Sequence, residues 1–242
     1  MPSGTLLLSA LVNLAAAAAF ACAGARFLRP APTEVNRLAQ RGFALYWLGT
    51  AAYTAQSGVM DALAYAGVTS FPLFLAVRYL SIPVLCAALA GGSYYLLYLY
   101  TGRKAWVWLA SGLYAVVGLA MTFYVASRRP YGVVVTDWRT DLAYAAPYEA
   151  TPVFSLLLLL LVLPPIAGGV AYALLARRVQ DRAARRRVLL VGLGIAAWSL
   201  AALAARLSES SGLVQLLSRP VAGALVATLV LLAYARPRTV DA

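Results

Sequence analysis

Three ionisable side chains lie well inside long apolar segments, and they are the first candidates for chemistry in this sequence. Asp61, Arg78 and Arg219 stand among residues that are otherwise almost all apolar. A charged group at such a position is costly unless it has a partner or a function. Three further charged residues, at the borders of neighbouring segments, are Glu149, Arg206 and Glu209. Three acids and three bases are therefore available to form ion pairs or to line a polar pocket.

Helical spacing places further polar groups beside Asp61. Tyr53 and Ser57 precede it by eight and four residues, so all three share one face of a helix. Gln56 lies on the same segment. One interpretation is an outward-facing polar pocket for a small ligand, in which Asp61 and Arg78 face each other. The other is a set of ion pairs that ties helices together, with arginines extending toward the lipid headgroups.

The residue types limit the chemistry of such a pocket. The chain has no histidine, which removes the commonest metal ligand and catalytic base. Cys22 and Cys86 fall at different depths of the expected helices, so we expect no disulfide between them. We expect no metal and no cofactor. A membrane enzyme, for instance of lipid or carotenoid metabolism, ranks third among the possible functions, because Asp61 is the only carboxylate within an expected span.

The composition indicates which elements position these residues. Apolar residues make up 63% and charged residues 12% of the 242-residue chain, and the charges cluster between long apolar runs. That pattern is typical of a chain whose solvent is lipid, where backbone groups must be paired within helices. We therefore predict an all-α integral membrane protein, a single seven-helix bundle over residues 1–242. The seven spans are predicted at residues 5–28, 42–65, 72–100, 105–126, 151–176, 188–207 and 212–234.

The basic residues predict the orientation of this bundle. Fourteen of them flank the odd-numbered loops and the C-terminal tail, whereas the even-numbered loops carry three, Arg128, Arg129 and Arg139. Because basic residues are retained on the cytoplasmic side, the N-terminus is expected outside and the C-terminus inside. Headgroup contacts thus account for the net charge of +12, and no nucleic-acid partner is expected. The arginine, alanine and leucine bias suggests a bacterial inner membrane.

The longest loop, Ser127–Ala150, is then external. It holds Tyr131, Trp138 and Tyr144 among its charged residues, and a disordered linker would be poorer in aromatic residues. We therefore expect it to fold back over the bundle, with Gly132–Val135 starting a short β-hairpin.

Two resemblances concern the segment Arg78-Tyr79-Leu80-Ser81-Ile82-Pro83. It resembles the Arg-Tyr…Pro helix of microbial rhodopsins, which are also seven-helix proteins with the N-terminus outside. In that family a helix-seven lysine binds retinal, but the stretch Arg219–Tyr234 contains none. Covalent retinal is therefore excluded.

The same segment, followed by Leu96–Arg103 with its Thr-Gly-Arg turn, is similar to the seven-helix input domains of bacterial sensor histidine kinases. The Arg-rich turn Arg177–Arg187 is similar as well. This resemblance implies a sensory role. Members usually continue into a cytoplasmic kinase, whereas this chain stops at Ala242, so we expect any output to pass through a separate partner.

The leading hypothesis is a receptor-like or sensory protein that binds a small ligand from the outer side and signals through a separate cytoplasmic or membrane partner. A small-solute or ion transporter or channel is the main alternative. Kinking prolines and embedded charges favour it, but the inner half of the bundle offers no ionisable residue to continue a path. The lipid bilayer is the one partner that composition requires, and the residues leave the oligomeric state open.

Overall fold

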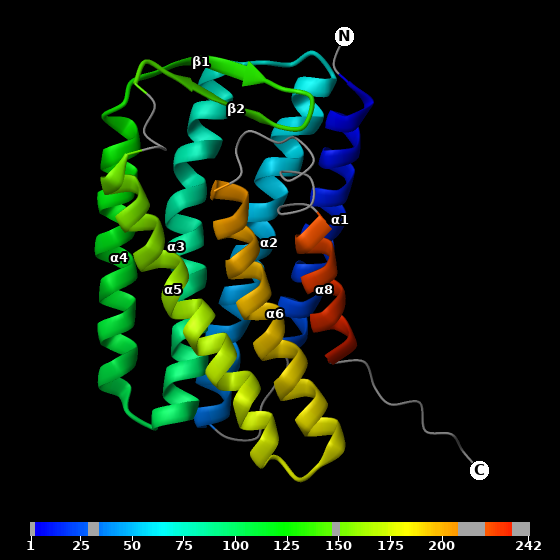
Figure 1. Ribbon diagram of the computed structural model, residues 1–242, viewed down its shortest axis with the longest axis vertical. Coiled ribbons are helices and arrows are strands. Elements are labelled where there is room, and N and C mark those ends of the chain that lie inside the picture. The colour runs from blue at the N-terminus through cyan, green and yellow to red at the C-terminus, as the bar shows by residue number, and fades with distance from the viewer. Residues whose placement is uncertain (1–2, 29–33, 147–150, 208–220, 234–242) are drawn as a thin grey trace, which may run out of the picture.

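The computed structural model describes residues 3–28, 34–146, 151–207 and 221–233. Long helices run up and down beside one another, and a β-hairpin crosses one end of the bundle (Figure 1). The helices are α1 (Gly4–Phe27), α2 (Glu34–Tyr65), α3 (Phe71–Thr101), α4 (Lys104–Ala126), α5 (Pro152–Leu175), α6 (Arg182–Leu207) and α8 (Ala222–Ala233). The remaining elements are strands β1 (Pro130–Val135) and β2 (Thr140–Tyr144) and the short 3₁₀ helix η1 (Ala176–Arg178). We call the ends of the bundle the hairpin end and the arginine end, the latter carrying Arg177 and Arg185.

Among the described residues, four helices are long and apolar enough to cross a membrane. They are Gly4–Phe27, Phe71–Gly92, Lys104–Ala126 and Pro152–Arg178. The outer surface of the bundle agrees with this reading, since Trp108 and Phe123 on α4 expose 76% and 73% of their surface. A helix of a water-soluble bundle would turn such side chains toward the core. The predicted helical and membrane character is therefore confirmed.

Helix α2 carries more polar residues than the four helices named above, and several of them face the interior. Thr50, Thr54 and Asp61 are all almost fully buried. The hydroxyls of Thr50 and Thr54 donate to the carbonyl oxygens of Tyr46 and Thr50, each at 2.8 Å. These bonds within the helix satisfy buried hydroxyls without any partner from another helix. Helix α2 therefore turns polar residues into an otherwise apolar core.

The helix ends agree with the predicted spans in four cases and differ in three. The bounds of α1, α3, α4 and α5 lie within one residue of the prediction. Helices α2 and α6 begin eight and six residues earlier, at Glu34 and Arg182. The predicted spans were marked by apolar runs, which show only where a helix contacts hydrocarbon, whereas these two helices also include the charged residues that precede the apolar run. At α6 the Asp181 carboxylate accepts the Ala184 N–H at 2.7 Å and caps the charged first turn. Of the seventh predicted span, residues 222–233 form α8, and residues 212–220 and 234 lie outside the described residues.

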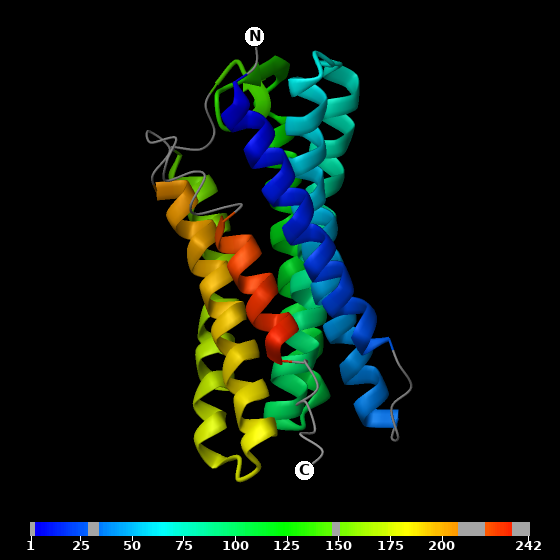
Figure 2. The same cartoon turned by 90° about the vertical axis from the view of Figure 1, so that its right-hand side faces the viewer.

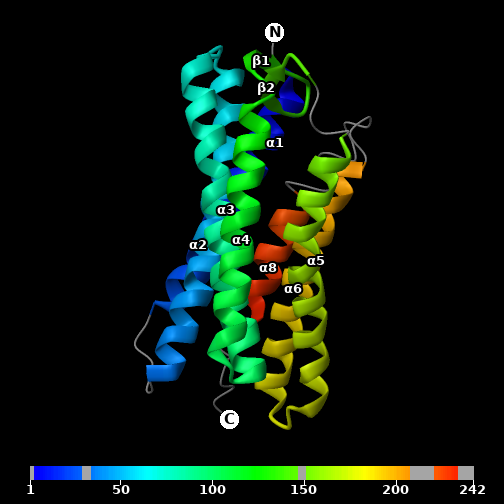
Figure 3. The same ribbon diagram turned by 90° about the vertical axis from the view of Figure 1, so that its left-hand side faces the viewer.

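The predicted hairpin is confirmed. Strands β1 and β2 pair antiparallel, with Val133 opposite Leu142 and Val135 opposite Thr140. Its turn contacts the start of the chain, since the Asp137 carbonyl oxygen accepts bonds from Ser3 and Thr5 at 2.9 and 2.6 Å. The hairpin therefore folds back over the bundle, lying across the end where α1 begins (Figures 1 and 3).

The helices pack largely in chain order. Helix α1 lies along α2, α2 along α3 and α3 along α4, while α5 lies along α6. Helix α8 contacts both α1 and α6 and sits between them (Figure 2). This order brings residues of α1, α2 and α3 opposite residues of α5 and α6, which is the arrangement that encloses the cavity described next.

A layer of aromatic side chains crosses the interior between these helices. We call it the aromatic layer; its members are Phe20, Phe27, Phe43, Tyr46, Trp47 and Trp198. The ring of Phe20 stacks on Trp47 with centroids 5.6 Å apart and meets Trp198 edge-on at 5.4 Å. Phe20 and Trp47 are fully buried. The layer therefore fills the core where α1, α2 and α6 meet.

Candidate ligand cavity

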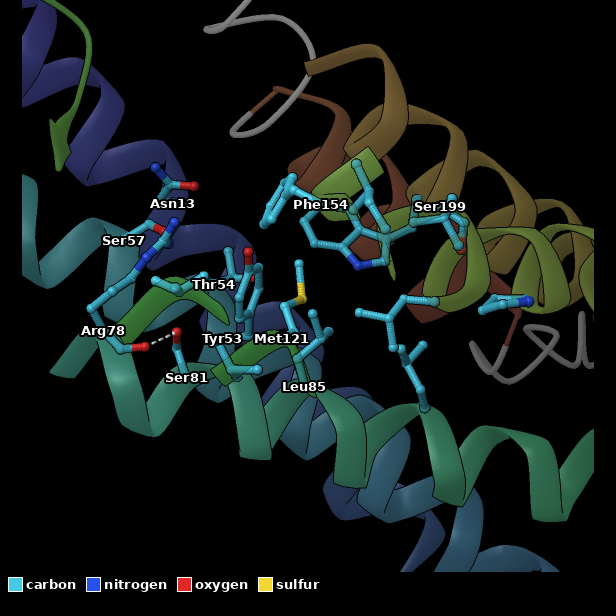
Figure 4. Close-up of a pocket in the computed structure, with 18 residues that line it drawn as sticks. Asn13, Tyr53, Thr54, Ser57, Arg78, Ser81, Leu85, Met121, Phe154 and Ser199 are labelled. Carbon is cyan, nitrogen blue, oxygen red and sulfur yellow. Dashed lines mark hydrogen bonds between the residues drawn. The ribbon is translucent and has the colours of Figure 1, made fainter. Parts of the chain in front are cut away.

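A cavity of about 160 Å³ lies between α1, α2, α3, α4, α5 and α6. One side is polar, and its side chains come from α1, α2 and α3: they are Asn13, Tyr53, Thr54, Ser57, Arg78 and Ser81. Leu85, Met121 and Phe154 line the middle, and Ser199 lies at the far side (Figure 4). The cavity is thus asymmetric, with most of its polar groups gathered at one end and a largely apolar lining, apart from Ser199 and Trp198, along the rest.

Arg78 is the only charged residue among those that line this cavity. Its side chain extends from α3 toward Ser57 and Asn13 (Figure 4), and its backbone carbonyl accepts the Ser81 hydroxyl at 2.7 Å. One guanidinium nitrogen, Nη2, lies 3.9 Å from Oδ1 of Asp141 on β2. The side chains of Arg78 and Asp141 are 20% and 16% exposed. A long, partly exposed ion pair of this kind is weak.

A second, smaller cavity of about 30 Å³ adjoins the first beneath the hairpin. Asn13, Ser57 and Arg78 line both cavities, which places the two side by side. The smaller one is bounded by the hairpin residues 138–141 and by Asp61. Its volume is enough for one or two water molecules, since a bound water needs about 10–15 Å³ on this measure.

Asp61 is 2% exposed and is held by hydrogen bonds from two other elements. Its Oδ1 accepts the backbone N–H of Thr140 on β2 at 2.6 Å, and its Oδ2 accepts the hydroxyl of Ser9 on α1 at 3.2 Å. A buried carboxylate is tolerated when donors of this kind replace its hydration. Asp61 therefore joins α1, α2 and the hairpin at one point.

The structure brings several predicted site residues together. Asp61, Arg78, Gln56 and Ser57 line the smaller cavity, and Tyr53, Ser57 and Arg78 line the larger one. The inferred shared face of Tyr53, Ser57 and Asp61 is consistent with this placement. The direct pairing of Asp61 with Arg78 stays a prediction.

The remaining predicted residues are not placed at the cavity. Arg206 lies in the last turn of α6, and its side chain is outside the described part of the chain. Glu149, Glu209 and Arg219 lie outside the described residues altogether. Their proposed part in a polar cluster at the hairpin end therefore stays a prediction.

Sequence reasoning missed the polar residues that come from α1, α6 and the hairpin. Ser9, Asn13 and Ser199 were passed over because single small polar residues are common in apolar helices. The four-residue spacing of Ser9 and Asn13, which puts both on one face of a helix, was a usable signal. Asp141 gave no such signal, because nothing local in an external loop indicates which helix the loop covers.

The ionisable and sulfur-containing side chains near the cavities have the following arrangement. Among the described residues, no three His, Cys, Asp or Glu side chains come together as a metal site. Both oxygens of Asp61 already accept hydrogen bonds. Cys22 and Cys86 are both free, as expected, and neither lines a cavity described above. The arrangement is suited to hold a molecule by a hydrogen-bonding head and an apolar body.

Comparisons with known protein families, with curated proteins and with solved structures find no match to this chain. The likenesses to microbial rhodopsins and to sensor-kinase input domains therefore rest on the sequence motifs alone. A function must be argued from the cavity and its surroundings.

Proposed function

We propose that this chain is a receptor-like membrane protein of seven spans that binds a small amphipathic molecule in the larger cavity. The observation that carries the proposal is the asymmetry of that cavity, with Arg78 and neighbouring polar groups at one end and apolar walls beyond. Ligand sites in proteins commonly combine apolar walls with a few convergent polar groups.

The charge distribution supports a topology with the hairpin end outside and the arginine end in the cytoplasm. Fourteen basic residues flank the odd-numbered loops and the tail, against three in the even-numbered loops. Under this topology the N-terminus is external, the C-terminus is cytoplasmic, and the ligand reaches its cavity from the outer side of a bacterial inner membrane.

The lining residues favour a ligand with a hydrogen-bond-accepting or anionic head. The guanidinium of Arg78 has donors only, and it binds a carboxylate oxygen more strongly than it binds a neutral hydroxyl or carbonyl oxygen. Leu85, Met121 and Phe154 would contact an apolar body. A volume of about 160 Å³ has room for roughly ten non-hydrogen atoms if each takes about the space of one water.

The ion pair between Arg78 and Asp141 offers a means of reporting occupancy. A ligand acceptor at Arg78 competes with Asp141, so the occupied and empty states differ in how the hairpin is held. A ligand shifts such an equilibrium only through its different affinities for the two states. The resulting change in helix and hairpin contacts would be passed to a separate cytoplasmic or membrane partner.

The aromatic layer favours binding over transport. On the side where α1, α2 and α6 meet, a solute moving from the cavity toward the arginine end would meet Trp198, which lines the cavity, and then Phe20, whose ring contacts both Trp198 and Trp47. These residues lie nearer that end than Asn13, Tyr53 and Ser199 on the same helices. Conduction would require this packing to open, whereas binding requires no such change.

The proposal is tested with a matched series of eight-carbon ligands. Octanoate, octanol and octylamine each have eight carbons and differ in the head group, and octanoate has ten non-hydrogen atoms. Calorimetric titration of the full chain in detergent should give an affinity order of octanoate, then octanol, then octylamine. Arg78→Gln should lower octanoate affinity about tenfold or more and leave octanol nearly unchanged, because only the charge-assisted bond is lost.

A matched control is Arg128→Gln, which removes an arginine at the hairpin end that does not line either cavity described above. It should leave all three affinities unchanged. Equal affinities for the three ligands, or octanoate binding that survives Arg78→Gln, would refute the ligand class. Vesicle uptake of octanoate faster than by protein-free vesicles would favour transport instead.

A further inference from the structure

A second binding surface lies at the opposite end of the bundle, where α5 and α6 meet. A groove of about 520 Å³ runs between these helices at the arginine end. Val170 and Leu174 of α5 form one wall, and Leu189 and Leu193 of α6 form the other. All four side chains are 40–51% exposed. The groove is therefore open and apolar, and it lies on the outer surface of the bundle.

Close contact of two glycines with the facing backbone explains why a groove forms here. A Cβ on Gly169 would lie 2.8 Å from the backbone nitrogen of Ala196, and one on Gly192 would lie 2.6 Å from that of Ala173. The two helices thus touch backbone to backbone along a seam of small residues. The larger side chains beside the seam do not fit between the two backbones, so they lie on either side of it and leave a groove between them.

The base of the groove is strongly basic. Arg177 of η1 and Arg185 of α6 line it, and both are exposed. Residues 176–187 contain six arginines and one acidic residue, a net charge of +5. The acidic residue is Asp181, whose carboxylate already caps α6. Among the described residues no ion pair neutralises Arg177 or Arg185, so the two arginines present charged donors at the base of an apolar groove.

We propose that this groove binds one anionic phospholipid, with the phosphate held by Arg177 and Arg185 and an acyl chain lying between the two walls. Val170 is seven residues from Arg177, so the walls rise about 10 Å above the arginines along the helix axis. That order, a cationic base followed by hydrocarbon, matches the order of a lipid from headgroup to chain. Basic pockets between helices at the cytoplasmic surface bind acidic headgroups in this way.

The apolar walls decide between a lipid and an acidic protein as the occupant. An acidic peptide would use the arginines but would leave four aliphatic side chains facing its charges. A zwitterionic lipid would place its acyl chain between the apolar walls, but its headgroup would gain less electrostatic attraction from the segment of net charge +5. Only an anionic lipid uses both features. The inference requires that α5 crosses the membrane, which its length and apolarity support, and it does not depend on the ligand of the cavity.

The test measures lipid retention by the full-length chain in native mass spectrometry. Dioleoyl phosphatidylglycerol should bind as a single retained adduct at concentrations at which dioleoyl phosphatidylcholine is not retained. Each arginine near an anionic headgroup contributes roughly fivefold, so Arg177→Gln with Arg185→Gln should weaken the adduct about thirtyfold. The matched control, Arg182→Gln with Arg186→Gln, removes the same charge from residues that do not line the groove and should weaken it only a few-fold.

A second arm tests the walls without changing charge. Val170→Ala with Leu193→Ala should weaken dioleoyl phosphatidylglycerol several-fold and leave dihexanoyl phosphatidylglycerol nearly unchanged. These two residues lie seven and eight positions, about 10–12 Å, from Arg177 and Arg185, where a six-carbon chain makes little contact. Equal loss in the groove and control arginine variants would show diffuse charge attraction and overturn the site. If a polyglutamate peptide displaces the lipid and the double wall variant has no effect, the surface would be assigned to an acidic protein. Octanoate binding should be the same in all three double variants, which separates this result from the function of the cavity.

Discussion

Asp61→Ala should release the hairpin from the bundle and cause a large loss of stability. Asp61 accepts the Thr140 N–H at 2.6 Å and the Ser9 hydroxyl at 3.2 Å, and it is 2% exposed. A hydrogen bond to a charged group contributes about 1.5–3 kcal/mol, and a buried N–H left without an acceptor costs about 1–3 kcal/mol. These contributions overlap, so we expect a loss of about 3–5 kcal/mol in the free energy of unfolding.

Two related variants test whether the hydrogen bonds cause this loss. Asp61→Asn keeps an oxygen for the Thr140 N–H, and its new amide group can donate to Ser9, so the cost should be about 1–2 kcal/mol. Asp141→Asn breaks only the weak, partly exposed pair with Arg78 at 3.9 Å and should cost less than about 1 kcal/mol. The expected order of melting temperatures in detergent is therefore wild type, Asp141→Asn, Asp61→Asn and then Asp61→Ala.

Hydrogen exchange locates the effect. In Asp61→Ala the amide of Thr140 should exchange much faster than in the wild type, because its acceptor is gone and the strand can open locally. Amides in the middle of α4, away from this contact, should keep their protection. Unchanged protection at Thr140, or a melting temperature of Asp61→Ala equal to that of Asp141→Asn, would refute the role assigned to Asp61.

Three further predictions concern charge pairing, topology and pigment. If Asp61 and Arg78 also interact, Asp61→Asn and Arg78→Ala should each lower the melting temperature more than the double variant does, whereas simply additive effects would show that they are not paired. A tag at Thr136 should be accessible from outside and a C-terminal reporter should be cytoplasmic; a report from the same side would contradict the seven-span topology. Added retinal should give no adduct that borohydride traps, because the only lysine is Lys104, next to a turn at the arginine end.

The sequence was sufficient to predict those features that depend on local periodicity and composition. The bounds of α1, α3, α4 and α5 followed from apolar runs that end at charged or turn-forming residues. The hairpin followed from β-branched residues after Gly132 in an aromatic-rich loop. For α2 and α6 the starts were missed, because the helices extend through Glu34–Arg41 and Arg182–Arg187, where hydropathy no longer marks the helix.

Only part of the candidate site could be predicted, namely the residues on helices that carry a charged side chain within an apolar segment. Asp61 and Arg78 stood out because their location is costly in lipid. The acceptor and donor groups that hold them come from residues far away in the chain, such as Ser9 and Thr140, which have no unusual local context. The pairing of β2 with the end of α2 is a long-range contact, and no spacing rule within either segment determines it.

The hairpin is joined to the helices around the cavities by contacts of different strength. Asp61 fixes β2 to α1 and α2 through two hydrogen bonds to a buried carboxylate, and these are worth more than the partly exposed contact between Arg78 and Asp141. The strong contact keeps the hairpin in place whether or not the cavity is occupied. The contact between Arg78 and Asp141, at 3.9 Å and partly exposed, is the weaker of the two, and under the proposed function it is the one with which a molecule bound at Arg78 would compete. If the proposed function holds, a bound molecule would shift the position of Asp141 without unfolding the strand, and occupancy would be reported reversibly.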